Sequence, residues 1–299
     1  MPTTKSLTKS KIKKLELIAN EVRRDIIETL VAAGSGHSAG PLGMADIFTA
    51  FYFHILNHRP KSPHWPDRDR LILSNGHICP VQYVTMAHAG YFPKKELKTL
   101  RKLNSRLQGH PHREALDGLE TTSGPLGSGL SQACGIALAA RLDNQRYQTY
   151  CLTSDGEHQE GNYWEAVMFA AKERLSNLTV VVDRNYIQID GHTETVNPLD
   201  SLKAKYEAFN WNVLEINGHD FLAIVAAIHE AKAEYQKPTV IIANTIPGKG
   251  VSYMEFDYRW HGLPPGSADV PGDPKKEDQV RIALRDLRTL EGKIISEHE

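Results

Sequence analysis

The middle of the chain alternates between short apolar runs and a stretch of helical periodicity. One apolar run covers residues 150–153 and a second covers residues 178–182. Between them, apolar residues recur at the i, i+3, i+4 and i+7 spacing of one buried helix face, at Trp164, Val167, Met168 and Ala171. Strand, helix and strand in this order predict a right-handed βαβ unit with parallel strands.

The same alternation extends through the rest of the chain. Helical patterns predict helices over residues 11–33, 43–56, 94–104, 132–142, 200–210, 220–235 and 276–290, two of them capped by Asp200 and Asp220. Further strands are predicted over residues 71–74, 211–216 and 239–245. This order indicates an α/β fold, a doubly wound and mainly parallel sheet with helices on both faces. We expect one domain over residues 1–265 and a helical extension over residues 266–299.

The composition argues against several classes of partner. The 299 residues carry a formal net charge of −1, so the chain has no general attraction for nucleic acid or membrane surfaces. The basic run over residues 5–14 is short, and we interpret it as a solvated lead-in to the first helix. The N-terminus is polar and no apolar run approaches the length of a membrane span. Three cysteines without metal-like spacing are expected to be reduced thiols of a cytoplasmic protein, Cys79, Cys134 and Cys151.

Polar residues follow the two strands of the central βαβ unit, where ligands of parallel sheets bind. Asp155 offers a carboxylate, Asn185 a side-chain carbonyl, and the backbone carbonyl of Ile187 a third oxygen. Such oxygens suit Mg²⁺ or Ca²⁺, with a diphosphate completing the shell. Gly156 allows close approach of the backbone, and the following helix directs its N-terminus at the anion. An Asp-Gly pair after a strand is by itself as often a simple turn.

Four of the fourteen histidines stand in or beside loops that contain Gly or Pro, where no helix face requires them: His37, His77, His110 and His261. Imidazole donates to phosphate or sugar hydroxyls and exchanges protons near neutral pH. Four such groups around one cleft would suit a substrate rich in hydroxyls. A histidine is more often a surface or core residue, and we assign that ordinary role to His54, His58, His64, His88, His112, His219 and His229.

The central segment resembles the thiamine diphosphate motif of transketolases, a Gly-Asp-Gly followed further along the chain by Asn. Asp155, Gly156, Asn185 and the tail over residues 187–191 match this motif, whereas Ser154 replaces its first Gly. Further matches to the family are GHSAGPLG around His37, the pattern of Asp69, Arg70, Ser74, Gly76 and His77, the Gly-His-Pro at His110, the loop over residues 245–250, and His261-Gly262.

The resemblance implies roles for individual residues. It implies that His37, His110 and His261 act on the substrate, and that Asp155, Asn185 and Ile187 bind Mg²⁺, Ca²⁺ or Mn²⁺. It also implies a set of residues that bind thiamine diphosphate: His77, Gly124, Pro125, Leu126, Asp155, Gly156, Glu157, Asn185, Ile187 and His261.

The resemblance covers nearly this whole chain but only the first third to half of a typical transketolase. In that family the pyrimidine-binding domain supplies a Glu beside the aminopyrimidine of the cofactor. The resemblance therefore implies the N-terminal subunit of a split transketolase, paired as α2β2 with a chain that carries the pyrimidine-binding and C-terminal domains. Such an enzyme transfers a two-carbon unit between sugar phosphates. The alternatives are a split transketolase for an unusual sugar, a deoxyxylulose-phosphate synthase-like or E1-like chain, or a non-catalytic cofactor-binding half.

Overall fold

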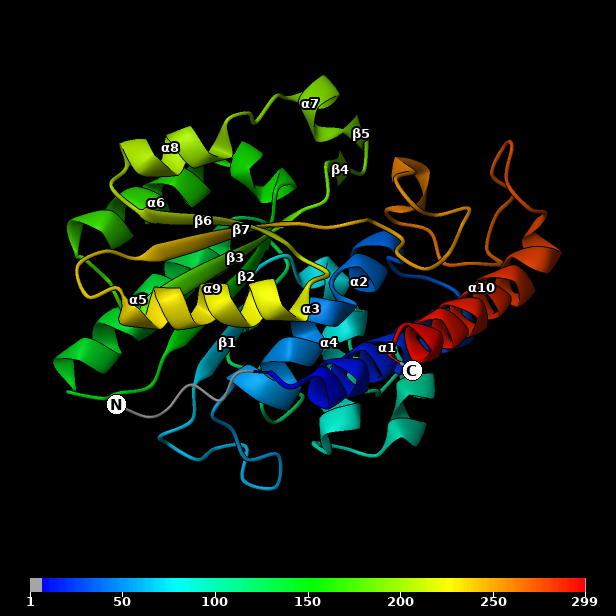
Figure 1. Ribbon diagram of the computed structural model, residues 1–299, viewed down its shortest axis with the longest axis horizontal. Coiled ribbons are helices and arrows are strands. Elements are labelled where there is room, and N and C mark those ends of the chain that lie inside the picture. The colour runs from blue at the N-terminus through cyan, green and yellow to red at the C-terminus, as the bar shows by residue number, and fades with distance from the viewer. Residues whose placement is uncertain (1–6, 299) are drawn as a thin grey trace.

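The fold is built on a parallel sheet of five strands in the order β1-β2-β3-β7-β6 (Figure 1). The computed structural model describes residues 7–298. The strands are β1 (Arg70–Leu73), β2 (Thr149–Ser154), β3 (Leu178–Arg184), β6 (Asn212–Asn217) and β7 (Thr239–Asn244). A separate antiparallel pair is formed by β4 (Ile187–Gln188) and β5 (Gly191–His192). The predicted doubly wound α/β fold is therefore confirmed.

Alternate residues of each central strand enter two different cores. Val181 and Ile241 join the core beneath α1 (Lys9–Ala33), α3 (Ala45–Ala50), α4 (Cys79–Ala89), α9 (Phe221–Ala233) and α10 (Lys276–Glu297). Val180 and Val182 join the core beneath α5 (Ser128–Leu142), α6 (Gly161–Lys172) and α8 (Leu202–Ala208). Because side chains of a strand point to opposite faces in turn, a sheet covered on both sides needs apolar residues at every position. This explains the continuous apolar runs in the sequence.

Short helical elements lie between the long ones. They are α2 (Ala39–Gly43), a π-helical turn over Phe51–Ile55, α7 (Thr193–Val196), and the 3-10 turns η2 (Gly76–Ile78), η3 (Lys94–Thr99), η4 (Gly156–Gln159) and η5 (Tyr258–Trp260). Two predicted helices are shorter than expected, because residues 43–56 are divided between α3 and the π-helical turn and residues 94–104 contain only η3. Positive φ angles at Arg101 and Asn104 are incompatible with continuing that helix.

The caps and faces of two helices differ from the sequence prediction. Asp220 caps α9 as expected, but the N-terminus of α8 is capped by Ser201 instead of Asp200. In α6 the buried face is formed by Tyr163, Ala166, Val167 and Ala170, whereas Met168 is 56% exposed. Three residues of the predicted stripe do face the core, since Val167 is buried and Trp164 and Ala171 are partly buried against it, so the prediction is wrong at Met168 alone.

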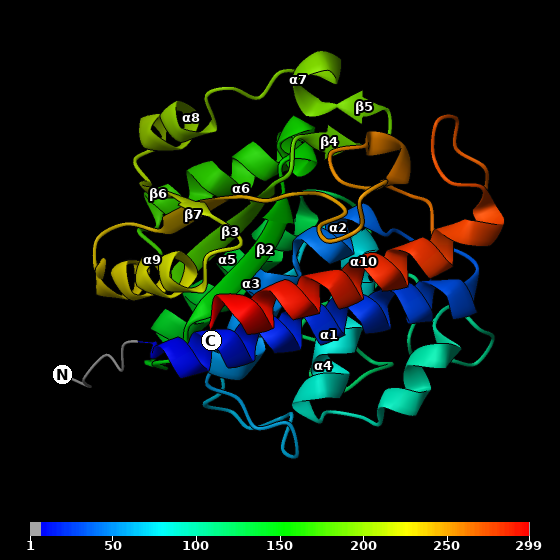
Figure 2. The same cartoon turned by 45° about the vertical axis from the view of Figure 1, so that its right-hand side comes forward.

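The C-terminal helix α10 lies along the N-terminal helix α1 (Figure 2). The Nδ2 of Asn20 donates to the carbonyl of Leu287 at 2.9 Å, and Ala283 and Leu287 join the core shared with α1. Lys9 begins α1, while Lys5 of the basic run lies outside the described residues. The division of the chain at residue 265 stays a prediction, although α10 packs on the domain instead of projecting from it.

The three cysteines are free thiols, all of them buried, so the expectation of unpaired cysteines is met. Within residues 7–298, no helix combines the length and the hydropathy needed to cross a membrane.

Candidate functional site

A cleft of about 450 Å³ opens where the central strands end. It is walled by the loops that follow α1, β1, β2 and β3, by the segment between η3 and α5, and by the loop after η5. The lining residues are His37, His77, His110, Gly124, Leu126, Ser154, Gly156, Gln159, Glu160, Ile187, Gln188, Ile189 and His261. All four histidines singled out in the sequence reach this one cleft, and the other histidines do not line it.

Three of these histidines form a compact cluster. The ring centroids of His37 and His77 are 4.7 Å apart, those of His77 and His261 are 5.2 Å apart, and those of His37 and His261 are 5.4 Å apart. Each comes from a different loop: the turn after α1, the 3-10 turn η2, and the residue after η5. Segments more than two hundred residues apart in the chain are thus brought together at one point.

The clustered histidines are held in their neutral form. Burial lowers the pKa of His37 to about 3, with smaller contributions from His261, Arg101 and His110. Burial lowers the pKa of His261 to about 4 and that of His77 well below its ordinary value. A neutral imidazole can accept a proton at one nitrogen and donate one at the other. Near neutral pH each ring of the cluster can therefore accept one hydrogen bond and donate another.

Two ring nitrogens of the cluster are buried and have no hydrogen-bond partner among the described residues, the Nδ1 atoms of His37 and His261. Buried polar atoms are nearly always paired in folded proteins, and a bound group is one ordinary reason for an exception. These two atoms therefore fit a site that binds a polar molecule.

The turn after β2 forms one wall of the cleft. Ser154, which replaces a Gly of the family motif, is the last residue of β2 and is not among the residues with positive φ. A side chain at this position therefore causes no backbone strain. The turn is also fixed from behind, because both nitrogens of the buried His158 are bonded, Nδ1 to the carbonyl of Ser154 and Nε2 to the hydroxyl of Tyr206.

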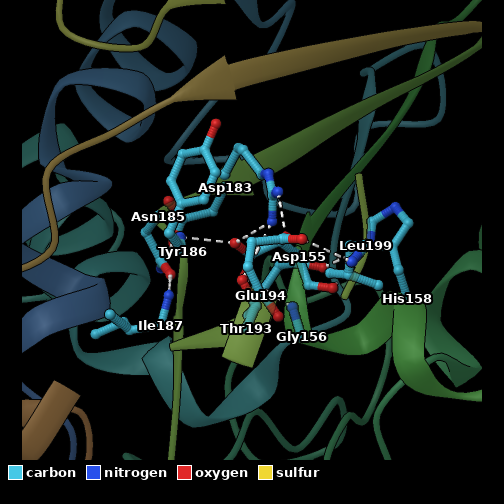
Figure 3. A network of polar contacts seen from close by, with 12 residues as sticks. Asp155, Gly156, His158, Asp183, Asn185, Tyr186, Ile187, Thr193, Glu194 and Leu199 are labelled. Atoms are coloured by element: carbon cyan, nitrogen blue, oxygen red, sulfur yellow. Dashed lines mark hydrogen bonds and ion pairs between the residues drawn. The ribbon is translucent and has the colours of Figure 1, made fainter. Parts of the chain in front are cut away.

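Asp155 and Asn185 lie at neighbouring strand ends (Figure 3), and their chain neighbours Ser154, Gly156 and Ile187 line the cleft. Asp155 is fully buried, and its carboxylate accepts hydrogen bonds from the amides of Gly156 and Tyr186 and from Arg184. Burial raises the pKa of Asp155 to about 6, against the opposing effect of Arg184 and the two amides. The Oδ1 of Asn185 accepts from the amide of Ile187 at 3.0 Å, and its Nδ2 donates to Asp183 at 2.7 Å.

Asp155 and Asn185 supply the type of ligand atom, oxygen, that hard divalent cations prefer. Asp155 supplies a carboxylate, and the Oδ1 of Asn185 has a second lone pair beyond its bond to Ile187. Within the described residues, no group of three or more His, Cys, Asp or Glu side chains could hold a metal ion. A cation here would therefore depend on neutral oxygens and on the ligand for the rest of its shell. Gly124 has free space around the position that a Cβ would occupy, which leaves room for a ligand at the opposite wall.

Glu157 has a different position from the one expected of a cofactor-binding residue. It is fully buried and does not line the cleft. Its carboxylate accepts from the Ser74 hydroxyl at 2.6 Å, from the Gly127 amide at 2.8 Å and from the Ser154 amide at 3.0 Å. Glu157 thus ties three site loops together from beneath. Pro125 is also outside the lining, although its neighbours Gly124 and Leu126 are part of it.

Several residues of the site were not found from the sequence. Gln159 and Glu160 line the cleft a few residues after Asp155, and Gln188 and Ile189, which belong to the motif tail but were given no role of their own, line it after Asn185. Arg184, which bonds to Asp155, lies inside that motif and could have been noticed as a charge at the end of an apolar strand. Of the histidines assigned ordinary roles, His219 and His88 are partly buried and hydrogen-bonded to the carboxylates of Asp46 and Asp25.

Comparison with known proteins agrees with this geometry. Residues 15–277 match the family model described as "Transketolase, thiamine diphosphate binding domain". The chain is 41% identical to the 6-deoxy-6-sulfo-D-fructose transketolase subunit SqwG of Clostridium sp., over 82% of this chain and 89% of that protein. It is 37% identical to an apulose-4-phosphate transketolase subunit of Phocaeicola vulgatus, over 94% of this chain and 97% of that protein.

Solved structures show the same relationship. Transketolase from Leishmania mexicana superposes with a TM-score of 0.80 at 31% identity, covering 95% of this chain and 45% of that one. Transketolase from Campylobacter jejuni gives a TM-score of 0.79 at 31% identity, covering 95% of this chain and 48% of that one. The chain thus spans less than half the length of these solved transketolases. From the family match, the near full-length relatives and the histidine cleft together, this chain belongs to the transketolase family and carries its thiamine diphosphate binding domain.

Proposed function

We propose that this chain is the N-terminal subunit of a two-chain transketolase. The enzyme would transfer a two-carbon glycolaldehyde unit from a ketose phosphate to an aldose phosphate, using thiamine diphosphate and a divalent cation, Mg²⁺ in the first instance. The observation that carries the proposal is the convergence of His37, His77, His110 and His261 on one cleft beside the Asp155 turn.

The residues of the chain would divide the work by position. His37 and His261 have buried, unpaired Nδ1 atoms and neutral rings, so either can form a hydrogen bond with a substrate hydroxyl at the reacting end of the sugar. His110 is exposed at the rim of the same cleft and would bind a sugar hydroxyl. His77 would donate to the diphosphate. The several histidines facing one cleft favour a polyhydroxylated substrate over the pyruvate of E1-like enzymes.

The cofactor would be held between two walls of the cleft. Asp155, Asn185 and the Ile187 carbonyl would bind the cation, and Gly124 and Leu126 would face the organic part of the cofactor from the other side. Thiamine diphosphate, when bound, supplies the nucleophilic carbon and the electron sink of the reaction. The chain contributes orientation, exclusion of water and proton transfer.

A second chain would complete the site, in an assembly that we propose to be α2β2. Two relatives that match this chain over nearly their whole length carry the word "subunit" in their names, and the chain of the Leishmania mexicana transketolase is more than twice as long. We place the assembly in the cytoplasm.

The test is to co-express the chain with the product of a neighbouring reading frame that has the length and motifs of the missing half. Turnover is measured with Mg²⁺ and thiamine diphosphate, for the chain alone and for the purified pair. The donors are xylulose 5-phosphate, apulose 4-phosphate and 6-deoxy-6-sulfofructose, and pyruvate tests the E1-like and synthase-like alternatives. The acceptors are ribose 5-phosphate and glyceraldehyde 3-phosphate.

Turnover of a ketose donor by the pair but not by either chain alone is expected. Turnover of pyruvate alone would replace the proposal with one of the alternatives. Cofactor binding without turnover by any combination would favour a non-catalytic half.

A further inference from the structure

Arg184 lies at the end of β3 and is almost completely buried, with 2% of its side chain exposed. A buried guanidinium is costly unless its donors are paired. Here they are paired on both sides, and the two sides belong to different parts of the molecule. One side faces the strand end with Asp155, and the other faces the segment that follows β5.

On the first side, Nη1 of Arg184 donates to Oδ2 of Asp155 at 3.2 Å and to the hydroxyl of Thr193 at 3.3 Å. The same Oδ2 accepts from the amide of Tyr186 at 2.7 Å. The guanidinium carbon also lies 3.9 Å from the centre of the Tyr186 ring. Asp155, Arg184 and Tyr186 therefore form a closed set of contacts that fixes one carboxylate oxygen.

On the second side, Nη2 of Arg184 donates to Glu194 at 2.5 Å and to Asp200 at 2.9 Å. Glu194 is 31% exposed, and its other oxygen accepts from the amides of Leu199 and Asp200, so this carboxylate is well fixed. Asp200 is 70% exposed, and such a pair contributes little. Glu194 is therefore the principal anchor of Arg184.

The carboxylates around Arg184 require a positively charged side chain that can bond to more than one of them. Asp155, Glu194 and Asp200 all contact the one guanidinium, and Asp183 lies close enough to Asp155 for the two carboxylates to interact. The planar fork of Arg can bond carboxylates on two sides at once, whereas the ammonium of Lys is a single point charge. Only Arg at this position joins Asp155 to Glu194.

We propose that Arg184 is a positioning residue of the cofactor site, which holds Asp155 in the orientation of a cation ligand by clamping it to Glu194. This proposal rests on the proposed function, since it assumes that Asp155 binds the cation of thiamine diphosphate. Groups that orient a metal ligand typically change metal affinity by about 10- to 100-fold when they are removed.

The experiment measures Mn²⁺ affinity by electron paramagnetic resonance of the free ion, with saturating thiamine diphosphate, on the purified two-chain assembly. The variants are Arg184→Met, Arg184→Lys and Glu194→Gln. The matched control is Arg141→Met, which removes an exposed Arg that pairs with Glu173 on the surface. Thermal unfolding of each variant without cofactor shows whether the fold itself has changed.

Arg184→Met is expected to weaken Mn²⁺ binding by about 10- to 100-fold, and Arg184→Lys to fail to restore it, because charge without the fork leaves Asp155 unclamped. Glu194→Gln should weaken binding by several-fold although it does not touch Asp155, and Arg141→Met should leave binding unchanged.

Two results would overturn the proposal. Tighter Mn²⁺ binding by Arg184→Met would mean that Arg184 acts only as a repelling charge. Equal affinity with a lowered melting temperature would mean that its role is confined to the fold. Failure of the wild-type assembly to bind Mn²⁺ with thiamine diphosphate is a different outcome, because it would refute the cofactor site itself.

Discussion

Replacing Glu157 tests whether this residue stabilises the fold itself or only contacts the cofactor. The carboxylate is fully buried and accepts three hydrogen bonds, two of them from the backbone amides of Gly127 and Ser154. Glu157→Ala would leave both amides buried without a partner, at about 1–3 kcal/mol each. We therefore expect the free energy of unfolding of the cofactor-free chain to fall by about 2–6 kcal/mol.

Glu157→Gln gives a finer version of the same test. Its carbonyl oxygen can keep the bonds from Ser74 and Gly127, but its NH₂ then faces the amide of Ser154, and two donors oppose each other. A loss of about 1–3 kcal/mol is expected, smaller than for Ala. Glu165→Gln on the exposed face of α6 is the control and should change stability by less than about 0.5 kcal/mol.

The assay is urea unfolding without thiamine diphosphate, followed by circular dichroism and by tryptophan fluorescence to check that both report one transition. If Glu157 only touched the cofactor, both variants would unfold at the wild-type urea concentration in the absence of cofactor. That result would refute the reasoning and restore the interpretation of Glu157 as a cofactor ligand.

Three further predictions concern packing, pH and a buried ion pair. Gly129→Ala would place a Cβ 2.5 Å from the Cα of Ser74 and should lower the free energy of unfolding by about 1–3 kcal/mol. Gly135→Ala on the same helix meets no atom within 4 Å and should be neutral or stabilising by up to about 1 kcal/mol. Equal melting temperatures for the two variants would contradict this prediction. His37 and His261 have folded pKa values of about 3 and 4 against an ordinary value of 6.5, so the unfolded chain binds more protons between pH 6.5 and 4. The stability that depends on these two neutral rings is fully present above pH 6.5, and as the solution is acidified the free energy of unfolding falls by about 1.4 kcal/mol per pH unit for each ring. Urea unfolding midpoints at pH 7, 6 and 5 would measure this fall, and His37→Asn should make it smaller. Asp46→Asn would break the buried pair with Arg23 and the bond from His219, and should cost about 3–5 kcal/mol in the same urea assay, while Asp117→Asn in the exposed His64 pair should cost nothing measurable.

The elements of the sheet were predictable because their sequences leave little choice. The runs before Asp155 and Asp183 are mainly apolar and buried at every position, as in parallel strands covered on both faces, and charged residues mark where each strand ends. The same logic located the cleft, since strand ends of a parallel sheet share one edge. The convergence of the histidines followed from motifs resembling those of the family, because no local pattern shows that His37 and His261 will meet.

The misses share a physical cause, which is competition between similar local choices. Met168 and Val167 are equally apolar neighbours on α6, and only the packing of the helix against the sheet decides which one is buried. Asp200 and Ser201 are both good caps; in the structure Asp200 accepts a hydrogen bond from Arg184, and Ser201 caps α8. Glu157 is a different case, because its role toward the cofactor stays a prediction; only its place in the 3-10 turn η4, outside the cleft lining, differs from what the motif suggests.

The alternation of side chains along β3 also governs which changes in length this protein can tolerate. Asp183 and Arg184 are consecutive, so the pleat sends one toward Thr245 and Asn185 and the other toward Asp155 and Glu194. Deleting or inserting one residue within β3 would exchange the two destinations and swap the cores of the strand at the same time. We therefore expect homologous chains to vary the identity of apolar residues in this strand while keeping its length fixed.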